Sequence, residues 1–253
     1  MLLPNTQMAG WPSLLAIHGP GSASDEHAHH ALHLVLARAG TLRVCVGDHQ
    51  HEVAGVLTPP DLAHAIAAEG ATVLLVFVDP ESSAGAALSE QLAGQPRWIT
   101  PDERDAWLAD LADAPEVDEL AAWARALLVS LGVASASPAK LHPKVRKLVG
   151  LLRERPLDAD SSLETLAAEV GLSPSRLMHA FTESIGLPLR AYLRWLRVQR
   201  AALAITRGVP LARAALEAGF SDAAHMSRTF RDMFGLPPSA LASRSQFMQA
   251  GPA

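Results

Sequence analysis

The C-terminal part of the chain carries one sequence pattern twice between Ser161 and Ser239. Each copy has an alanine, then a glycine and a serine separated by one apolar residue, then a phenylalanine, and then glycine–leucine–proline. The first copy is Ala167, Gly171-Leu172-Ser173, Phe181 and Gly186-Leu187-Pro188, and the second is Ala215, Gly219-Phe220-Ser221, Phe230 and Gly235-Leu236-Pro237. A glycine tolerates the positive φ of a tight turn that ends a helix. The repeat therefore predicts two similar helix–turn–helix units in tandem.

The second helix of each unit has a marked start and an outward face. Ser173 is a predicted N-cap, and Pro174 occupies the first helical position, where a missing N–H costs nothing. In the second unit Ser221 or Asp222 is the expected cap. The side chains predicted to face outward are Ser175, Met178, His179 and Thr182 in the first unit, and Ala224, His225, Arg228 and Arg231 in the second. Such faces enter the major groove of DNA in helix–turn–helix proteins.

Charge is divided unevenly along the chain. Residues 1–139 contain 5 basic and 17 acidic side chains, a net charge of −12, whereas residues 140–253 contain 16 and 9, a net charge of +7. A basic domain releases counterions when it binds a polyanion, and an acidic one is repelled. A helix predicted over 189–207 joins the two units and carries Arg194 and Arg197, which either contact DNA or lie on a solvated face. We expect double-stranded DNA to bind the C-terminal part.

Residues 9–79 have the pattern of short β-strands. Apolar-rich runs near residues 13–17, 31–37, 41–46, 53–57 and 72–78 alternate with turn sequences that contain glycine, proline and aspartate. This pattern is typical of an antiparallel sandwich or barrel. From Ser82 the composition becomes helical. The predicted fold class is α+β, with a β domain over 1–81, a helical connector over 82–131, a linker over 132–140 and an all-α domain over 141–245.

The last helix of the connector, predicted near residues 114–131, has a wide apolar stripe. Val117, Leu120, Ala124, Leu127 and Leu131 recur at helical spacing. A stripe of this width serves equally to pack on its own β domain or to form a homodimer. The sequence leaves both interpretations open.

Histidine is concentrated in the N-terminal part, where eight of the eleven histidines precede residue 65. His27 and His29 share one face of an extended strand, because side chains alternate with period two. His33 has the same parity, and His64 follows a second turn. Imidazole nitrogens suit divalent transition metals such as Zn, Fe, Ni or Cu. The alternatives are a pocket for a small organic ligand and a solvated strand edge.

Several other classes of protein are disfavoured. One cysteine, Cys45, allows no intrachain disulfide, and no apolar run approaches the roughly 18 residues of a membrane span. Gly-x-Ser-x-Gly elbows, Walker loops and dinucleotide-binding glycine patterns are absent from the sequence. We therefore expect a cytoplasmic protein that is not an enzyme and has no membrane partner. A metal-dependent enzyme and an adaptor that reuses helix pairs without DNA are the alternatives.

The C-terminal part resembles the AraC/XylS transcription regulators over about residues 145–243. The most specific string runs from Gly219 to Phe230 and is followed by Gly235-Leu236-Pro237-Pro238. The resemblance implies two helix–turn–helix units joined by a linker helix, with DNA and RNA polymerase as partners. It places base-contacting positions at Ser175, Met178 and His179, and at Ala224, His225 and Arg228. Family members often have Gln and Arg where this chain has Met178 and His179, which weakens the expected readout by the first unit.

The N-terminal part is similar to the cupin fold. The matching residues are Gly21, His27, His29, His33 and Gly40, followed by Pro59, Asp61 and His64. Metal-binding cupins usually have Glu where this chain has His33, and the second motif has Gly where this chain has Asp61. The resemblance implies a small β-barrel that senses an effector, either a small molecule or a metal bound by His27, His29, His33 and His64.

Overall fold

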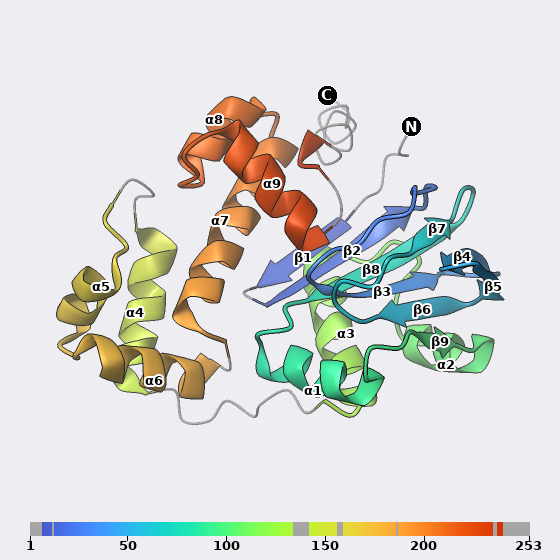
Figure 1. The fold of residues 1–253 in the computed structure, drawn as a ribbon, viewed down its shortest axis with the longest axis horizontal. Coiled ribbons are helices and arrows are strands. Elements are labelled where there is room, and N and C mark those ends of the chain that lie inside the picture. Colours follow the sequence, from blue (N-terminus) through green and yellow to red (C-terminus); the bar gives the residue numbers. More distant parts are fainter. Residues whose placement is uncertain are drawn as a thin grey trace.

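The computed structural model describes residues 7–11, 13–133, 142–155, 159–185, 187–234 and 237–239. The strands and the first three helices lie on one side of the molecule, and the remaining helices lie beside them (Figure 1). Most of the predicted linker over 132–140 lies outside the described residues, as do Gly186, Gly235 and Leu236 of the repeat.

The larger of two sheets is antiparallel and has six strands in the order β1-β2-β8-β3-β6-β9. Their bounds are Gln7–Trp11 (β1), Leu14–Pro20 (β2), Thr72–Val78 (β8), Leu32–Ala37 (β3), Gly55–Thr58 (β6) and Arg97–Ile99 (β9). The apolar runs that predicted strands near residues 13–17, 31–37, 53–57 and 72–78 correspond to β2, β3, β6 and β8.

The smaller sheet has three antiparallel strands in the order β5-β4-β7, with bounds His49–Val53, Leu42–Val46 and Ala65–Ala67. Among the described strands no ladder joins the two sheets, so the predicted barrel is not closed. A core that includes Val35, Val44, Val56 and Ile66 lies between the sheets. Stacking two sheets buries these side chains without closure, which explains why the chain forms a sandwich.

Helices α1 (Ser83–Leu92), α2 (Pro101–Leu108) and α3 (Val117–Ser130) cover one face of the larger sheet. Alternate strand residues such as Leu14, Ala16 and Val76 point into this core. The apolar stripe of α3 lies there as well, with Leu120, Ala124 and Leu127 buried. The stripe therefore packs on its own β domain and does not offer these side chains to a second copy.

All of the regular elements that the structure describes in the C-terminal region are helices. The helices are α4 (Pro143–Glu154), α5 (Leu163–Val170), α6 (Pro174–Ile185), α7 (Leu189–Thr206), α8 (Leu211–Glu217) and α9 (Ala223–Phe234). The glycines of both predicted turns have positive φ, +64° at Gly171 and +79° at Gly219. Ser162 caps α5 by accepting a hydrogen bond from the backbone N–H of Thr165.

The two halves share a continuous apolar core. Residues of β2 and β8 that point away from α1–α3, such as Leu15, Ile17 and Phe77, belong to the same cluster as Trp195 of α7 and Phe234 of α9. Helix α9, the last helix of the repeat, is therefore packed on the β domain. Figure 1 shows this contact at the C-terminal end of α9. Among the described residues, none of the helices combines the length and the apolar character that a bilayer span requires.

Candidate nucleic-acid interface and histidine cluster

Helix α6 presents the outward face that its spacing predicted. Leu177 and Phe181 are buried, while the four predicted outer residues are exposed: Ser175, Met178, His179 and Thr182. Met178 is 49% exposed, so its thioether side chain is available for contact from this face. The face of α6 is thus mostly uncharged and carries few strong hydrogen-bonding groups. It could contact base edges mainly through apolar and weakly polar side chains.

Helix α9 presents a more strongly charged face. Met226 and Phe230 are buried, and the exposed outer residues are Ala224, Arg228 and Arg231. His225 is only half-buried and contributes to the start of the helix. Its backbone N–H donates to Asp222 Oδ1 at 2.6 Å, and its Nδ1 lies 3.1 Å from Ser221 Oγ. Helix α9 therefore combines a well-defined N-terminal cap with two exposed arginines on its outer face, Arg228 and Arg231.

Arg194 of α7 is paired with acidic residues that follow β8. Arg194 lies 3.1 Å from Asp79 Oδ2 and 3.7 Å from Glu81 Oε1, both in the segment that follows β8. Trp195 also donates its indole N–H to Asp79, whose side chain is buried. Arg194 is thus paired with the β domain in this structure. Arg197 is half-buried on the same helix.

The C-terminal end of α9 is fixed to the segment that carries the histidines. The backbone N–H of His30 donates to the carbonyl of Asp232 at 2.7 Å, and that of Ala31 donates to the carbonyl of Met233 at 3.4 Å. The last carbonyls of a helix have no partner within the helix, so these contacts satisfy groups that otherwise need water. The β domain therefore caps the helix that carries Arg228.

The structure brings together the four histidines that the sequence singled out. Ring centroids are 4.6 Å apart for His27 and His64, 4.9 Å for His29 and His33, and 5.2 Å for His29 and His64. One ring nitrogen from each of His27, His29 and His64 lies within 4.8 Å of the others. His33 is adjacent, with Nδ1 3.2 Å from Nε2 of His29. We refer to these four side chains as the histidine cluster.

Burial keeps most of the cluster neutral. Desolvation, with the neighbouring His64 and His27, lowers the pKa of His29 to about 3. Desolvation also lowers the pKa of His33 and of His64. Neutral imidazoles have a free lone pair and are the form that binds metals. The chemistry of this donor set therefore fits a transition metal and does not fit the oxygen-preferring Mg²⁺ or Ca²⁺.

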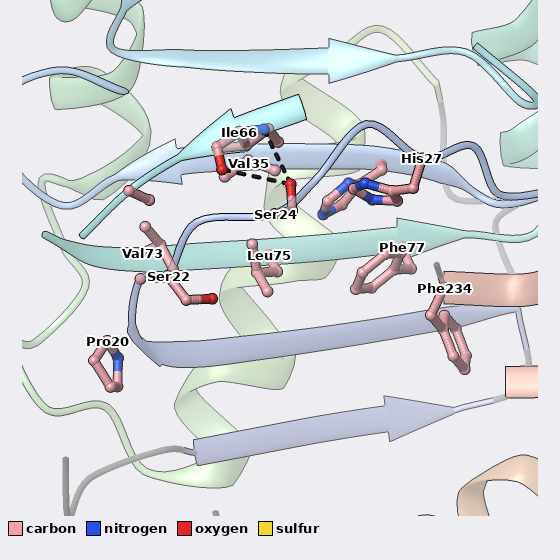
Figure 2. Close-up of a pocket in the computed structure, with 13 residues that line it drawn as sticks. Pro20, Ser22, Ser24, His27, Val35, Ile66, Val73, Leu75, Phe77 and Phe234 are labelled. Carbon is pink, nitrogen blue, oxygen red and sulfur yellow. Dashed lines mark hydrogen bonds between the residues drawn. The ribbon is translucent and has the colours of Figure 1, made fainter. Parts of the chain in front are cut away.

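An apolar pocket opens beside the cluster between the two sheets (Figure 2). His27 and His33 line one part of it, and Phe77 of β8 and Phe234 of α9 line another. Ser24 Oγ accepts a hydrogen bond from the N–H of Ile66 at 3.0 Å and fixes one wall. The pocket thus combines apolar walls with a few imidazoles, which is typical of sites for small ligands. Its lining includes a residue from the helix that carries Arg228.

Asp61 has a backbone conformation that usually favours glycine. Its φ is +60°, the left-handed conformation that glycine adopts at no cost and that aspartate tolerates better than most residues. Its carboxylate lies 3.8 Å from Nδ1 of His30. Asp61 therefore preserves the turn that leads to His64, although it is not glycine.

The sequence did not identify several residues that join the halves. Asp79, Trp195, Phe77 and Phe234 lie at the contact between the β domain and the helices. The acidic Asp79-Pro80-Glu81 sequence directly after an apolar strand was the available signal. His18 is also buried, and neither ring nitrogen has a hydrogen-bond partner among the described residues.

The helical region is similar to a known protein family. The family described as "Helix-turn-helix domain" matches residues 166–244. The arabinose operon regulatory protein of Escherichia coli (strain K12) is 31% identical over 104 residues, which are 39% of this chain and 36% of that protein. Residues 166–244 are an AraC-type helix-turn-helix domain.

A second relative matches a similar share of the chain to the arabinose operon regulatory protein. The transcriptional activator NphR of Rhodococcus sp is 32% identical over 110 residues, 42% of this chain and 32% of that protein. The chain thus spans only about a third of the length of these curated relatives. The AraC-type domain includes both predicted outward faces, on α6 and α9.

Two solved structures are similar in outline. An AraC-type transcriptional regulator from Chromobacterium violaceum is 28% identical and covers 43% of this chain and 96% of that chain, with a TM-score of 0.37. ToxT from Vibrio cholerae is 10% identical and covers 92% and 98% of the two chains, with a TM-score of 0.47.

Proposed function

We propose that this chain is a sequence-specific DNA-binding transcription regulator of the AraC/XylS type, whose N-terminal domain senses an effector. The observation that carries the proposal is the AraC-type domain at residues 166–244. It lies in the part of the chain with a net charge of +7. A basic, exposed helix face is what binding to a polyanion requires.

In this proposal α5–α6 and α8–α9 are two helix–turn–helix units. Helices α6 and α9 lie toward opposite ends of α7 (Figure 1). We expect them to enter successive major-groove faces, which are about 34 Å apart along a duplex, with α7 as the spacer. Arg228 is the best candidate for a bidentate guanine contact, because it is exposed on the outward face of α9. Ser175, His179 and Met178 would supply weaker contacts from α6.

The N-terminal domain would be the sensor, with a cupin-like arrangement of its two sheets. The apolar pocket and the histidine cluster adjoin each other there and share a wall with Phe234 of α9. An effector in this place would contact the domain that reads DNA. Effector binding that favours one packing of the two halves would change which arrangement of DNA sites the chain can contact.

The test of DNA binding uses the full chain and a labelled duplex from the region upstream of its own gene. We expect fluorescence anisotropy to report binding whose affinity falls steeply with salt, because phosphate contacts release counterions. A metal-dependent enzyme or a protein-binding adaptor would give no salt-dependent duplex binding. That outcome would reject the proposed function.

Substitution of Arg228 tests the direct contact. Arg228→Ala should weaken binding to the cognate site and relax the preference at one base pair, by about 1–3 kcal/mol of discrimination. Arg43→Ala is the matched control, since Arg43 is an exposed arginine on β4 far from the AraC-type domain. Affinities for all single-base variants of the site would be compared. Equal weakening for every base would assign Arg228 to phosphate contact.

A further inference from the structure

The backbone determines which nitrogen of His29 carries the ring proton. Nδ1 of His29 lies 3.0 Å from the carbonyl oxygen of Ala31. A carbonyl oxygen only accepts hydrogen bonds, so this Nδ1 is the donor. Burial lowers the pKa of His29 to about 3, so at neutral pH the ring is uncharged and has a single N–H group. Its Nε2 therefore has a lone pair and can only accept a hydrogen bond.

His29 in turn determines the proton position on His33. Nδ1 of His33 lies 3.2 Å from Nε2 of His29. Because that Nε2 can only accept, Nδ1 of His33 donates. Burial also lowers the pKa of His33, so this ring is uncharged as well and its Nε2 keeps a lone pair. The carbonyl of Ala31 thus makes Nε2 of His33 an acceptor, through two successive hydrogen bonds.

Nε2 of His33 is an acceptor that lacks a donor. His33 is 6% exposed, and this nitrogen has no hydrogen-bond partner among the described residues. A buried polar atom that is left unpaired costs free energy unless a ligand or a water molecule compensates for it. His33 also lines the apolar pocket between the sheets. A ligand in the pocket can therefore satisfy this atom by donating a hydrogen bond to it.

The other polar side chains of the pocket offer little that a ligand could accept from. Nδ1 of His27 lies 2.8 Å from the carbonyl oxygen of Asp25 and is used as a donor there. The hydroxyl of Ser24 is paired with the backbone of Ile66. Ser22 is exposed. The imidazoles that line the pocket thus leave it acceptors and use their donors elsewhere.

The pocket is also unsuited to an ion. None of the described residues that line it is a lysine, arginine, aspartate or glutamate. A carboxylate would lose its hydration there without a cation to pair with, and an ammonium group would lose it without an anion. The space is about 550 Å³ with its open mouth included, which is within the range of pockets for small organic ligands. The ligand that fits is therefore small, apolar and uncharged.

We propose that this pocket binds a neutral apolar molecule that bears a hydroxyl group, and that His33 selects it by accepting a hydrogen bond from that hydroxyl at Nε2. Phenols are the simplest such molecules, and their ring suits a pocket with Phe77 and Phe234 in its walls. The role of such a molecule as the effector rests on the proposed function above. Its binding rests on the pocket alone.

The first experiment compares three probes of similar shape by isothermal titration calorimetry on the full chain. The protein is treated with a chelator, so that no metal holds the ligand. The hydroxyl of para-ethylphenol is a methyl ether in para-ethylanisole and a carboxylate in para-ethylbenzoate. We expect the phenol to bind at least about 10-fold more tightly than the ether, since only the phenol satisfies the buried acceptor, and the carboxylate to bind most weakly. Absence of phenol binding, equal binding of phenol and ether, or tighter binding of the carboxylate would overturn the proposal.

Substitution of His33 tests its role in selection. His33→Phe removes the acceptor and keeps a ring that can stack on Phe77, so the ratio of phenol to ether affinity should fall about 10-fold. Retained binding of para-ethylanisole would show that the pocket is intact. His49→Phe, on exposed β5, is the matched control and should keep the original ratio. An unchanged ratio in His33→Phe would refute selection by His33.

NMR of the histidine ring nitrogens tests the proton positions without any substitution. His29 and His33 should both give the signals of uncharged rings protonated at Nδ1, and para-ethylphenol should shift the Nε2 resonance of His33. A His33 ring that is charged, or protonated at Nε2, would overturn the proposal. Loss of the proposed function has a different signature. Selective phenol binding by a chain that binds no duplex DNA rejects the regulator and leaves the ligand class standing, whereas salt-dependent DNA binding without this selectivity rejects the ligand class alone.

Discussion

Among single residues, the buried histidines make the stability of the protein depend on pH. The folded-state pKa of His29 is about 3, and those of His33 and His64 are also below the ordinary 6.5. At pH values between the lowered folded-state pKa of each histidine and 6.5, the unfolded chain binds more protons than the folded chain. The free energy of unfolding therefore rises with pH in this range. In metal-free protein the melting temperature should therefore be highest above 6.5 and should fall as the pH drops toward 3.

Matched variants separate this effect from general acid denaturation. His29→Gln should flatten the dependence of stability on pH. The slope of the unfolding free energy should fall by up to about 1.4 kcal/mol per pH unit, the value for one proton. His49→Gln removes an exposed histidine and should leave the dependence unchanged. A His29→Gln protein that keeps the full slope would show that other groups control acid stability.

Among the helices, Gly171 and Gly150 give opposite predictions for replacement by alanine. Gly171 ends α5 with φ +64°, so Gly171→Ala should destabilise the protein by about 1–2 kcal/mol, because a Cβ strains the left-handed conformation. Gly150 is exposed within α4 and an added Cβ would meet no atom within 4 Å. Gly150→Ala should stabilise by about 0.5–1 kcal/mol. Urea denaturation measures both, and a gain in stability for Gly171→Ala would contradict the assigned turn.

For the whole molecule, Asp79 joins the β domain to α7 through buried polar contacts. Its buried carboxylate accepts hydrogen bonds from Trp195 and Arg194 of α7. Asp79→Ala leaves the buried indole N–H of Trp195 without this acceptor and should cost roughly 1–3 kcal/mol of unfolding free energy. It should also speed hydrogen–deuterium exchange at the amide of His30. Asp48→Ala, in an exposed turn, should change neither measurement. Unchanged exchange at His30 would show that the docking of α9 does not depend on Asp79.

Local patterns predicted the elements whose own residues determine them. The turn glycines, the start of α6 at Pro174 and the buried positions Phe181 and Phe230 followed from spacing and conformational preference. Strands β1, β5, β7 and β9 were not predicted, because they are short or, like β5 with its sequence His-Gln-His-Glu-Val, mostly polar. Strands β7 and β9 are stabilised by ladders to distant residues of β4 and β6, which no local pattern records.

The sequence alone determined the repeated helical units, the separation of charge and the identity of the clustered histidines, because each depends on residue type and spacing along the chain. Only the tertiary structure decided that the sheets stack without closing, that α3 packs on its own domain and that Arg194 pairs with Asp79. It also placed Phe234 beside the histidine cluster. These outcomes depend on contacts between segments far apart in the chain, where burial and charge pairing outweigh local preference.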